Sequence, residues 1–308
     1  MSFKSKLKEN KFILNCYRKM EKSYYSFLTV LSPKLNTQAR YRQVFGKSLD
    51  LDHPQTLNEK VLWLKLNKNM KDPLVIQCAD KYAVREYVER CDCSEILNTL
   101  IGAWDRAEDI PWDELPSQFV LKWNFGAGMN IICDDKSRLD REKTIKQLKK
   151  WGKCKYWLPF SEMQYKYAPK KIVCEAYLND GKGFLPQDYK VYCFNGKAKY
   201  VMLCIGREIG RPKFYYFDKE FKHARLSAAG LSAPDDLKIE NPECVKKVFE
   251  YAEKLSAPFP FVRVDFYVVG EKVYFGELTF TPSAGLDGSR LRETDVLFGK
   301  MIDLDTLK

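Results

Sequence analysis

The chain of 308 residues has few histidines and no long apolar run. Its longest near-continuous apolar window, residues 24–31, is interrupted by Ser26 and Thr29. That window is far shorter than the roughly 18–20 residues that a membrane-spanning helix needs. Only His53 and His223 are available as imidazole ligands, and no cysteines show the paired spacing typical of zinc sites. The sequence therefore argues against a membrane span and against a zinc centre.

The ten cysteines also lack the pattern of a disulfide framework. They are scattered singly, and several lie inside apolar runs such as residues 131–133 and 172–174. We interpret them as reduced, buried, small hydrophobic residues. The N-terminal segment lacks the organisation of a secretory signal, because its lysines are interspersed with apolar residues. We expect a cytoplasmic protein.

Acidic residues are scarce only in the first 47 residues, which hold eleven Lys or Arg and two Glu, a net charge of +9. The formal charge of the whole chain is +11, so the remainder has only +2, which argues against a nucleic-acid partner. Apolar residues recur in residues 1–47 at three- to four-residue steps, which predicts a basic amphipathic helical extension. The helix either packs on the body with its lysines in water or contacts an anionic membrane surface.

Beyond Pro54 the chain reads as helices followed by mixed strands and helices, without internal repeats. This order favours an α+β fold over a doubly wound parallel sheet. Periodicity, caps and turn residues predict helices over residues 57–66, 80–88, 141–151 and 244–255, and strands over residues 119–123, 131–133, 171–177, 188–194, 199–205, 213–217, 261–268 and 272–280.

A glycine-rich loop, residues 124–130, joins the first two predicted strands. Gly126 and Gly128 let backbone amides approach an anion, and Lys122 supplies a positive charge for phosphate oxygens. No Gly-Lys-Ser/Thr follows, so this is not a Walker A loop. Lys81 and Arg85, four residues apart in a predicted helix, could point into the same cleft. For residues 124–130, the alternative to a phosphate-binding loop is an ordinary glycine-rich hairpin.

The last predicted hairpin has one carboxylate on each strand, Asp265 and Glu277. Alternation puts Arg263 and Asp265 on one face of the first strand, and Glu277 and Thr279 on one face of the second. A turn near Gly270 would bring Asp265 opposite Glu277, an arrangement that like charges make unfavourable. A Mg²⁺ ion between them would relieve the repulsion. Alternatively, both carboxylates face solvent and Arg263 simply pairs with Asp265.

Four further residues are candidates for binding. Glu175 ends an apolar strand whose backbone could meet an adenine edge, and Lys190 alternates in phase with Asp188. Arg207 and Arg211 flank a glycine and could bind a carboxylate or phosphate of an acceptor. A structural or solvated role is an equal alternative for each.

Taken in order, seven stretches resemble the ATP-grasp superfamily, and specifically its TupA-like branch, which is associated with bacterial surface-polysaccharide gene clusters. The resemblance covers about residues 40 to 300. The stretches are residues 57–60, 80–85, 119–128, 175–178, 188–190, 263–267 and 275–282.

The resemblance implies an ATP-grasp fold, in which two α+β lobes clasp a nucleotide. The expected division is an extension, residues 1–47, a first lobe with a glycine flap, residues 48–174, and a second lobe with the metal-binding hairpin, residues 175–308. The implied roles are phosphate binding by Lys81, Lys122 and Lys190 beneath Gly126 and Gly128, adenine binding at Glu175, Ala176, Tyr177 and Leu178, Mg²⁺ binding by Asp265, Glu277 and Thr279, and catalysis by Arg263 with Lys190.

The activity that the resemblance implies is ATP- and Mg²⁺-dependent joining of a carboxylate to an amine through an acyl phosphate. Thr279 stands where many ATP-grasp ligases have asparagine, a better metal ligand. A sugar kinase or a glycosyltransferase acting on a surface-glycan precursor is the alternative activity. A third hypothesis is a non-catalytic module that binds a nucleotide or a membrane.

Overall fold

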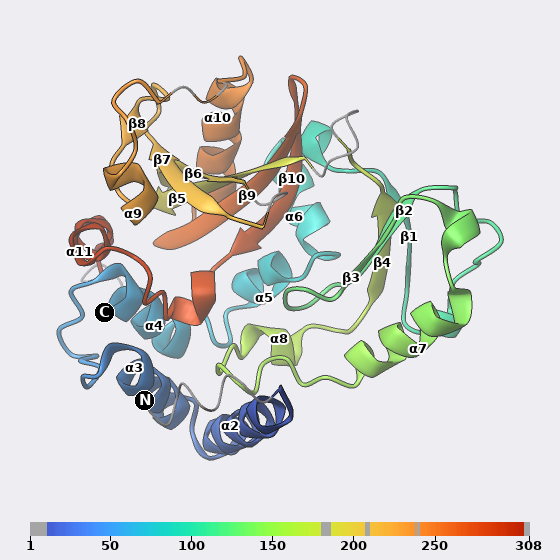
Figure 1. The fold of residues 1–308 in the computed structure, drawn as a ribbon, viewed down its shortest axis with the longest axis horizontal. Helices are drawn as coiled ribbons and strands as arrows, with labels where there is room; N and C mark the ends of the chain where they lie inside the picture. The colour runs from blue at the N-terminus through green and yellow to red at the C-terminus, as the bar shows by residue number, and fades with distance from the viewer. Residues whose placement is uncertain (1–10, 180–185, 207–209, 238, 240, 305–308) are drawn as a thin grey trace.

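Two antiparallel sheets organise the chain in the computed structural model, which describes residues 11–179, 186–206, 210–237, 239 and 241–304. A four-stranded sheet has the order β1-β4-β2-β3, and a six-stranded sheet has the order β10-β9-β5-β6-β7-β8. Figure 1 shows the two sheets apart, with α5 and α6 lying between them in this view and α8 below α5. The expected α+β class is confirmed.

The strands and helices follow one another in the order in which Figure 1 labels them. The strands are β1 (Leu100–Trp104), β2 (Phe119–Trp123), β3 (Asn130–Cys133), β4 (Ile172–Ala176), β5 (Gln187–Phe194), β6 (Lys197–Ile205), β7 (Lys213–Phe217), β8 (His223–Ala224), β9 (Phe261–Val269) and β10 (Lys272–Thr279). The α-helices are α2 (Lys11–Leu31), α3 (Pro33–Phe45), α4 (Leu57–Asn67), α5 (Pro73–Ala79), α6 (Val84–Arg90), α7 (Arg141–Gly152), α8 (Gln164–Tyr167), α9 (Ala228–Leu231), α10 (Val245–Ser256) and α11 (Arg292–Lys300). Short 3-10 helices are η1 (Ser94–Ile96), η2 (Ala107–Asp109), η3 (Lys136–Arg138) and η4 (Pro282–Gly285).

The predicted N-terminal helices are present from Lys11 onward as α2 and α3, with Ser32 between them and Pro33 as the first residue of α3. Residues 1–10 lie outside the described part of the chain. No helix in the described residues is long and apolar enough to cross a membrane. The predicted cap of α4 is confirmed, because the Thr56 side chain accepts a hydrogen bond from the Glu59 amide and Glu59 accepts one from the Thr56 amide.

The six-stranded sheet packs its apolar face on α10, α5 and α6. Alternation along β9 buries Val262, Val264, Phe266 and Val268 in this core, as the sequence predicts. The opposite face of the sheet is apolar where β5 ends and β9 begins, and this apolar region continues over Met202 of β6 and Tyr216 of β7 and packs on α4 and α11. Beyond it, the same face carries the charged side chains of Lys190, Arg263 and Asp265.

The four-stranded sheet has its own core with α7. The Leu121 and Trp123 side chains pack toward Leu148 of α7, and the Trp123 indole donates a hydrogen bond to the Leu148 carbonyl. Lys122 lies between these two residues and therefore projects from the other face. The face that carries Lys122 and the charged part of the second face of the six-stranded sheet are therefore left for the candidate site.

The helix predicted over residues 80–88 is shorter than expected. Regular helix begins only at Val84, because Asp80 accepts hydrogen bonds from the amides of Tyr82 and Ala83 and forms a turn before it. This turn, rather than a helix face, positions Lys81.

Candidate active site

The glycine-rich loop between β2 and β3 lies against the segment that precedes α6. Gly126 and Gly128 both have left-handed backbone angles, φ +69° and +73°. A Cβ atom at position 126 would lie 2.6 Å from the ring of Tyr156, so only glycine fits there without displacing the ring. The Lys81 ammonium donates a 2.5 Å hydrogen bond to the Gly126 carbonyl. The loop therefore rests on Tyr156 and is tied to Lys81.

Asn124 fixes the start of this loop. Its buried side chain donates to a carboxylate oxygen of Asp80 at 2.6 Å and to the Pro169 carbonyl at 2.7 Å, and it accepts from the Lys171 amide at 2.9 Å. The Asn124 carbonyl accepts from the Lys81 amide at 2.9 Å. Asn124 thereby holds the glycine loop and the Lys81 turn in one unit.

The predicted phosphate-binding Lys122 is paired with the predicted adenine-side Glu175. The Lys122 ammonium lies 2.7 Å from one oxygen of Glu175, and Arg85 lies 3.7 Å from the other oxygen. All three side chains are largely buried, with exposed fractions of 12% to 19%. Two cations from β2 and α6 therefore meet on one carboxylate of β4.

The closing hairpin brings Asp265 opposite Glu277, as predicted, but a β-bulge makes this possible. From Lys272 to Phe275 the strands pair in one register, with Phe275 opposite Phe266. The register then shifts at Gly276, so that Glu277 rather than Gly276 faces Asp265. Without the shift, Glu277 would lie opposite Val264, on the apolar face.

Gly276 permits this bulge because, without a side chain, its backbone can lie directly against the backbone of Asp265. A Cβ atom at position 276 would lie 2.8 Å from the Asp265 carbonyl oxygen. The sequence contains a signal for the bulge, because the buried apolar residues fall at 273 and 275 before Gly276 and at 278 and 280 after it. We did not predict the bulge from this change of phase.

Asp265 is the centre of a dense ion-pair network. Arg263 binds it with two hydrogen bonds, of 2.6 and 2.7 Å, and Lys190 approaches to 2.9 Å. Arg263 also donates to the Thr279 hydroxyl at 3.2 Å, and that hydroxyl donates to Glu277 at 3.1 Å. The structure thus brings together five of the predicted site residues, from β5, β9 and β10. They are Lys190, Arg263, Asp265, Glu277 and Thr279.

Lys81 connects this network to the glycine loop. Its ammonium lies 3.6 Å from Glu277 in addition to its bond with the Gly126 carbonyl. Burial lowers the pKa of Lys81, and nearby Lys122 lowers it further, while Glu277 acts in the opposite direction. For Glu277, burial alone would raise the pKa, but Lys81, Arg263 and Lys190 outweigh it and hold the pKa below its usual value. The carboxylate therefore stays ionised.

A buried pair beneath the site was missed by sequence reasoning. Glu162 accepts a 2.6 Å hydrogen bond from Thr281, and burial raises its pKa although Thr281 and Lys65 oppose this. Burial likewise lowers the pKa of Lys65 to about 8. Thr281, to which Glu162 is bonded, follows Thr279 at the end of β10 by two residues, so Glu162 lies near the predicted metal ligands. No motif indicates this, because Lys65, Glu162 and Thr281 are far apart in sequence.

The remaining predicted residues lie at the edge of the described site. Ala176 ends β4, and its carbonyl and amide are bonded to Asn98 and Thr99. Tyr177 and Leu178 follow it and are half-buried. Arg207 lies outside the described residues, and Arg211 is exposed, with its amide bonded to the Gly206 carbonyl. The structure does not bring Arg211 into the ion-pair network.

The donor set fits a magnesium ion held partly by phosphate oxygens. Asp265 and Glu277 face each other, Thr279 lies beside them, and three cations surround them. The described residues contain no group of three or more carboxylate, thiol or imidazole side chains arranged to hold a metal alone. Mg²⁺ typically takes one or two carboxylates and completes its shell with water and substrate phosphates.

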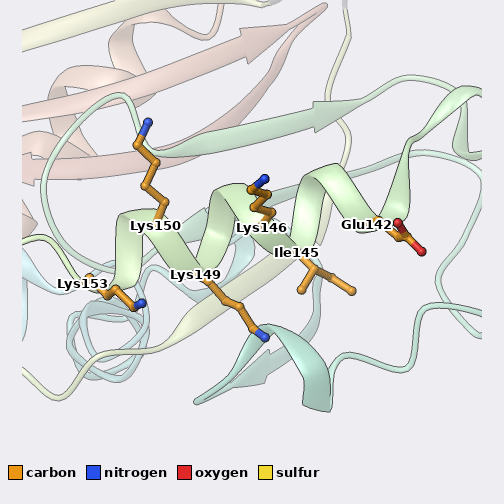
Figure 2. A pocket seen from close by; sticks show the side chains of 6 residues that line it. All are labelled: Glu142, Ile145, Lys146, Lys149, Lys150 and Lys153. Carbon is orange, nitrogen blue, oxygen red and sulfur yellow. The ribbon is translucent and has the colours of Figure 1, made fainter.

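The concave surface on α7 contains none of the residues of the candidate active site. Figure 2 shows that its lining side chains all project from one helix. They are Glu142, Ile145, Lys146, Lys149, Lys150 and Lys153. Lys149 is paired with Glu108, and α7 covers the face of the four-stranded sheet that is opposite to Lys122.

Several solved structures are similar to this chain at low sequence identity. D-alanine–D-alanine ligase from Bacillus anthracis is 17% identical, with 75% of this chain and 68% of that chain covered and a TM-score of 0.45. The corresponding ligase from Helicobacter pylori is 12% identical, with 80% and 69% covered and a TM-score of 0.43. The ATP-grasp ligase PsnB, in a complex with Mg, ADP and a variant of its minimal precursor, is 9% identical, with 79% and 65% covered and a TM-score of 0.43.

The comparison with curated proteins found no match. A family model described as TupA-like ATPgrasp matches residues 59–303, which include both sheets, the glycine loop and the closing hairpin. The expected resemblance is thereby confirmed over most of the chain. The chain belongs to the TupA-like ATP-grasp family.

Proposed function

We propose that this protein is an ATP- and Mg²⁺-dependent ligase that joins a carboxylate to an amine or a related nucleophile on a cell-surface glycan precursor. Family membership supports the use of ATP. The observation on which the proposal mainly rests is the bulged hairpin, which places Asp265 opposite Glu277 with Lys81, Lys190 and Arg263 around them. The glycan substrate follows from the resemblance of the motifs to the TupA-like branch.

The charges of the site suit transfer of the terminal phosphoryl group. A carboxylate oxygen of the substrate attacks the γ-phosphorus, the bond to the β-γ bridging oxygen breaks, and ADP leaves. The amine then attacks the acyl carbon, phosphate leaves and the nitrogen loses a proton. Lys81, Lys122 and Lys190 would bind phosphate oxygens, while Arg263 would stabilise the charge that develops on the transferred group.

Asp265 and Glu277 would hold Mg²⁺, which when bound neutralises charge on the phosphate oxygens. The Thr279 hydroxyl, already bonded to Glu277, would orient that carboxylate or a water molecule. Gly126 and Gly128 would let the loop cover the phosphates, and residues 175–178 would line the adenine. The position of Lys81 between Glu277 and the Gly126 carbonyl supports a role at the phosphates beneath the loop.

Trapping of an acyl phosphate would test the proposal. The protein is incubated with ATP, Mg²⁺, hydroxylamine and a panel of uronic acids and amino acids as the carboxylates. If the protein is a ligase, ADP leaves as the acyl phosphate forms, and hydroxylamine then displaces phosphate from it to give a hydroxamate, so that ADP and phosphate appear in equal amounts. ADP with a stable phosphosugar would instead indicate a sugar kinase. Turnover of a nucleotide sugar without ATP would indicate a glycosyltransferase, and either result would exclude the ligase.

Carboxylate variants give the matched control. Asp265→Asn and Glu277→Gln should each abolish hydroxamate formation, because one oxygen ligand is lost while the shape is kept. Glu271→Gln changes a carboxylate of the same hairpin that accepts a hydrogen bond from the Cys244 amide, outside the site. It should retain wild-type turnover. Equal losses in all three variants would mean that the hairpin acts only through stability.

A further inference from the structure

Helix α2 presents an apolar face that the body of the protein does not cover. Tyr17, Met20, Tyr24, Phe27 and Leu31 recur at alternating steps of three and four residues, which align them along one side of a helix. They are between 49% and 73% exposed. We call these five residues the outer face of α2. Figure 1 shows the helix at the periphery of the molecule, beyond α8.

The opposite side of α2 is fixed to the protein by buried contacts. Thr29 donates a 2.6 Å hydrogen bond to the Leu158 carbonyl, and Asn36 of α3 donates to the Tyr25 carbonyl at 2.6 Å. The Arg40 guanidinium stacks 3.5 Å above the Tyr25 ring. Because Tyr25 and Thr29 point inward, the outer face points away from the body over several turns. The helix axis must therefore lie parallel to anything that contacts this face.

The charge of the same segment indicates what that contact is. Residues 1–47 hold +9 of the +11 charges of the chain, and Arg18, Lys19 and Lys22 are exposed on α2 itself. A helix is only about 10 Å wide, so these cations stay within about one Debye length of a plane that touches the outer face. Two copies joined through this face would bring two such basic segments together. The aromatic residues of the face are also typical of a membrane interface rather than of a coiled-coil seam.

We propose that α2 docks flat on an anionic lipid surface, with its outer face in the headgroup region. Arg18 and Lys22 lie on the opposite, polar side of the helix, where they stay within about one Debye length of the lipid phosphates. This proposal does not depend on the reaction at the candidate active site. It assigns a function to the exposed side chains that the ligase chemistry leaves unexplained. The inner side of α2 also contacts residues 158–161, next to Glu162, so docking would hold the active-site lobe close to the bilayer.

Vesicle binding by the full-length chain tests this directly. Wild-type protein should sediment with vesicles of phosphatidylglycerol mixed with phosphatidylcholine, and much less with phosphatidylcholine alone, and added salt should weaken the binding. The double variant Met20→Glu, Phe27→Glu should bind about 100-fold more weakly, since burial of each apolar side chain contributes roughly tenfold or more. Both side chains are exposed, so the fold should be unchanged, as a thermal melt would check.

Two further variants separate the contribution of the positive charges from that of the apolar side chains. Lys19→Gln with Lys22→Gln should weaken binding by about fivefold for each lysine. Leu231→Glu adds one negative charge at an exposed leucine of α9, away from the outer face, and should bind as wild type does. Absence of binding by the wild type, or equal binding by the Met20 and Phe27 variant, would overturn the proposal. So would a wild-type dimer in sedimentation velocity that this variant converts to monomer, since the face would then belong to a second copy.

Discussion

Replacement of Gly276 by alanine tests whether the bulge in the closing hairpin sets the metal ligands. The new Cβ would lie 2.8 Å from the Asp265 carbonyl oxygen and 3.3 Å from its carbonyl carbon. Ordinary contacts begin near 3.4 Å, so the two strands must separate by about 0.6 Å at this point. Both partners are backbone atoms, so neither can rotate aside. Such overpacking costs about 1–3 kcal/mol of unfolding free energy.

The functional consequence should exceed the loss of stability. The displaced residues are Asp265 and Glu277, which directly follows position 276. Carboxylates displaced from a metal-binding geometry typically lose about 10–100-fold in metal affinity. Calorimetric titration with ATP, once in the presence of Mg²⁺ and once in the presence of a chelator, would measure this loss of metal affinity. We expect Gly276→Ala to keep the magnesium-free affinity, which depends on the lysines, and to lose most of the increment that Mg²⁺ gives to the wild type.

Gly270→Ala is the matched control in the same hairpin. Gly270 has φ +58° and nothing within 4 Å of the added Cβ, so alanine there costs backbone strain of about 1–2 kcal/mol without moving Asp265. It should keep the magnesium increment at a similar loss of stability. If Gly276→Ala responded to Mg²⁺ as fully as the wild type does, the bulge would not determine the geometry of the carboxylate pair.

Three further substitutions test the flap, the phosphate contact and the first helix of the body. Lys122→Met should lower ATP affinity about ten- to a hundredfold in calorimetry, whereas Lys143→Met on exposed α7 should not. Asn124→Ala removes donors to Asp80 and Pro169 and should cost about 2–4 kcal/mol in urea unfolding. For Glu59, burial alone would raise the pKa, but hydrogen bonds from Tyr41, Lys47 and two amides lower it to about 2. Its ionised form therefore stabilises the fold fully above about pH 4.5. Glu59→Gln should lower the free energy of unfolding by about 3 kcal/mol at neutral pH. The difference in this free energy between the variant and the wild type should shrink as the pH falls toward 2.

Local patterns predicted those parts of the site that depend on one or two neighbouring elements. Alternation in β9 identified Arg263 and Asp265 as one face and the valines as the other, because a strand reverses its side chains at every residue. Hairpin geometry then placed Glu277 near Asp265. The cap at Thr56 followed from its position before an apolar run. In each case the determining contacts are close in sequence.

Contacts between distant segments could not be predicted in this way. The helix pattern over residues 80–88 favoured a helical Lys81, but Asp80 forms a turn that Asn124, more than forty residues away, completes. Lys65 and Glu162 show no pattern of burial in the sequence, since only the packed fold removes them from water. The exposure of the outer face of α2 was also open, because an amphipathic helix can bury its apolar side on its own protein.

The distribution of ion pairs in the site predicts that Mg²⁺ and a polyphosphate help each other to bind. Asp265 is engaged by Arg263 and Lys190, Glu277 lies near Lys81, and Glu175 holds Lys122. Each predicted metal ligand is thus neutralised by a cation that is itself predicted to bind phosphate. A polyphosphate that attracts the cations weakens their hold on the carboxylates, and a cation bound between the carboxylates releases the lysines and the arginine. We therefore expect each ligand to lower the cost of binding the other, so that by linkage Mg²⁺ and the polyphosphate should bind with positive cooperativity. The self-neutralised network explains how so many charges remain stable in a largely buried site before either ligand arrives.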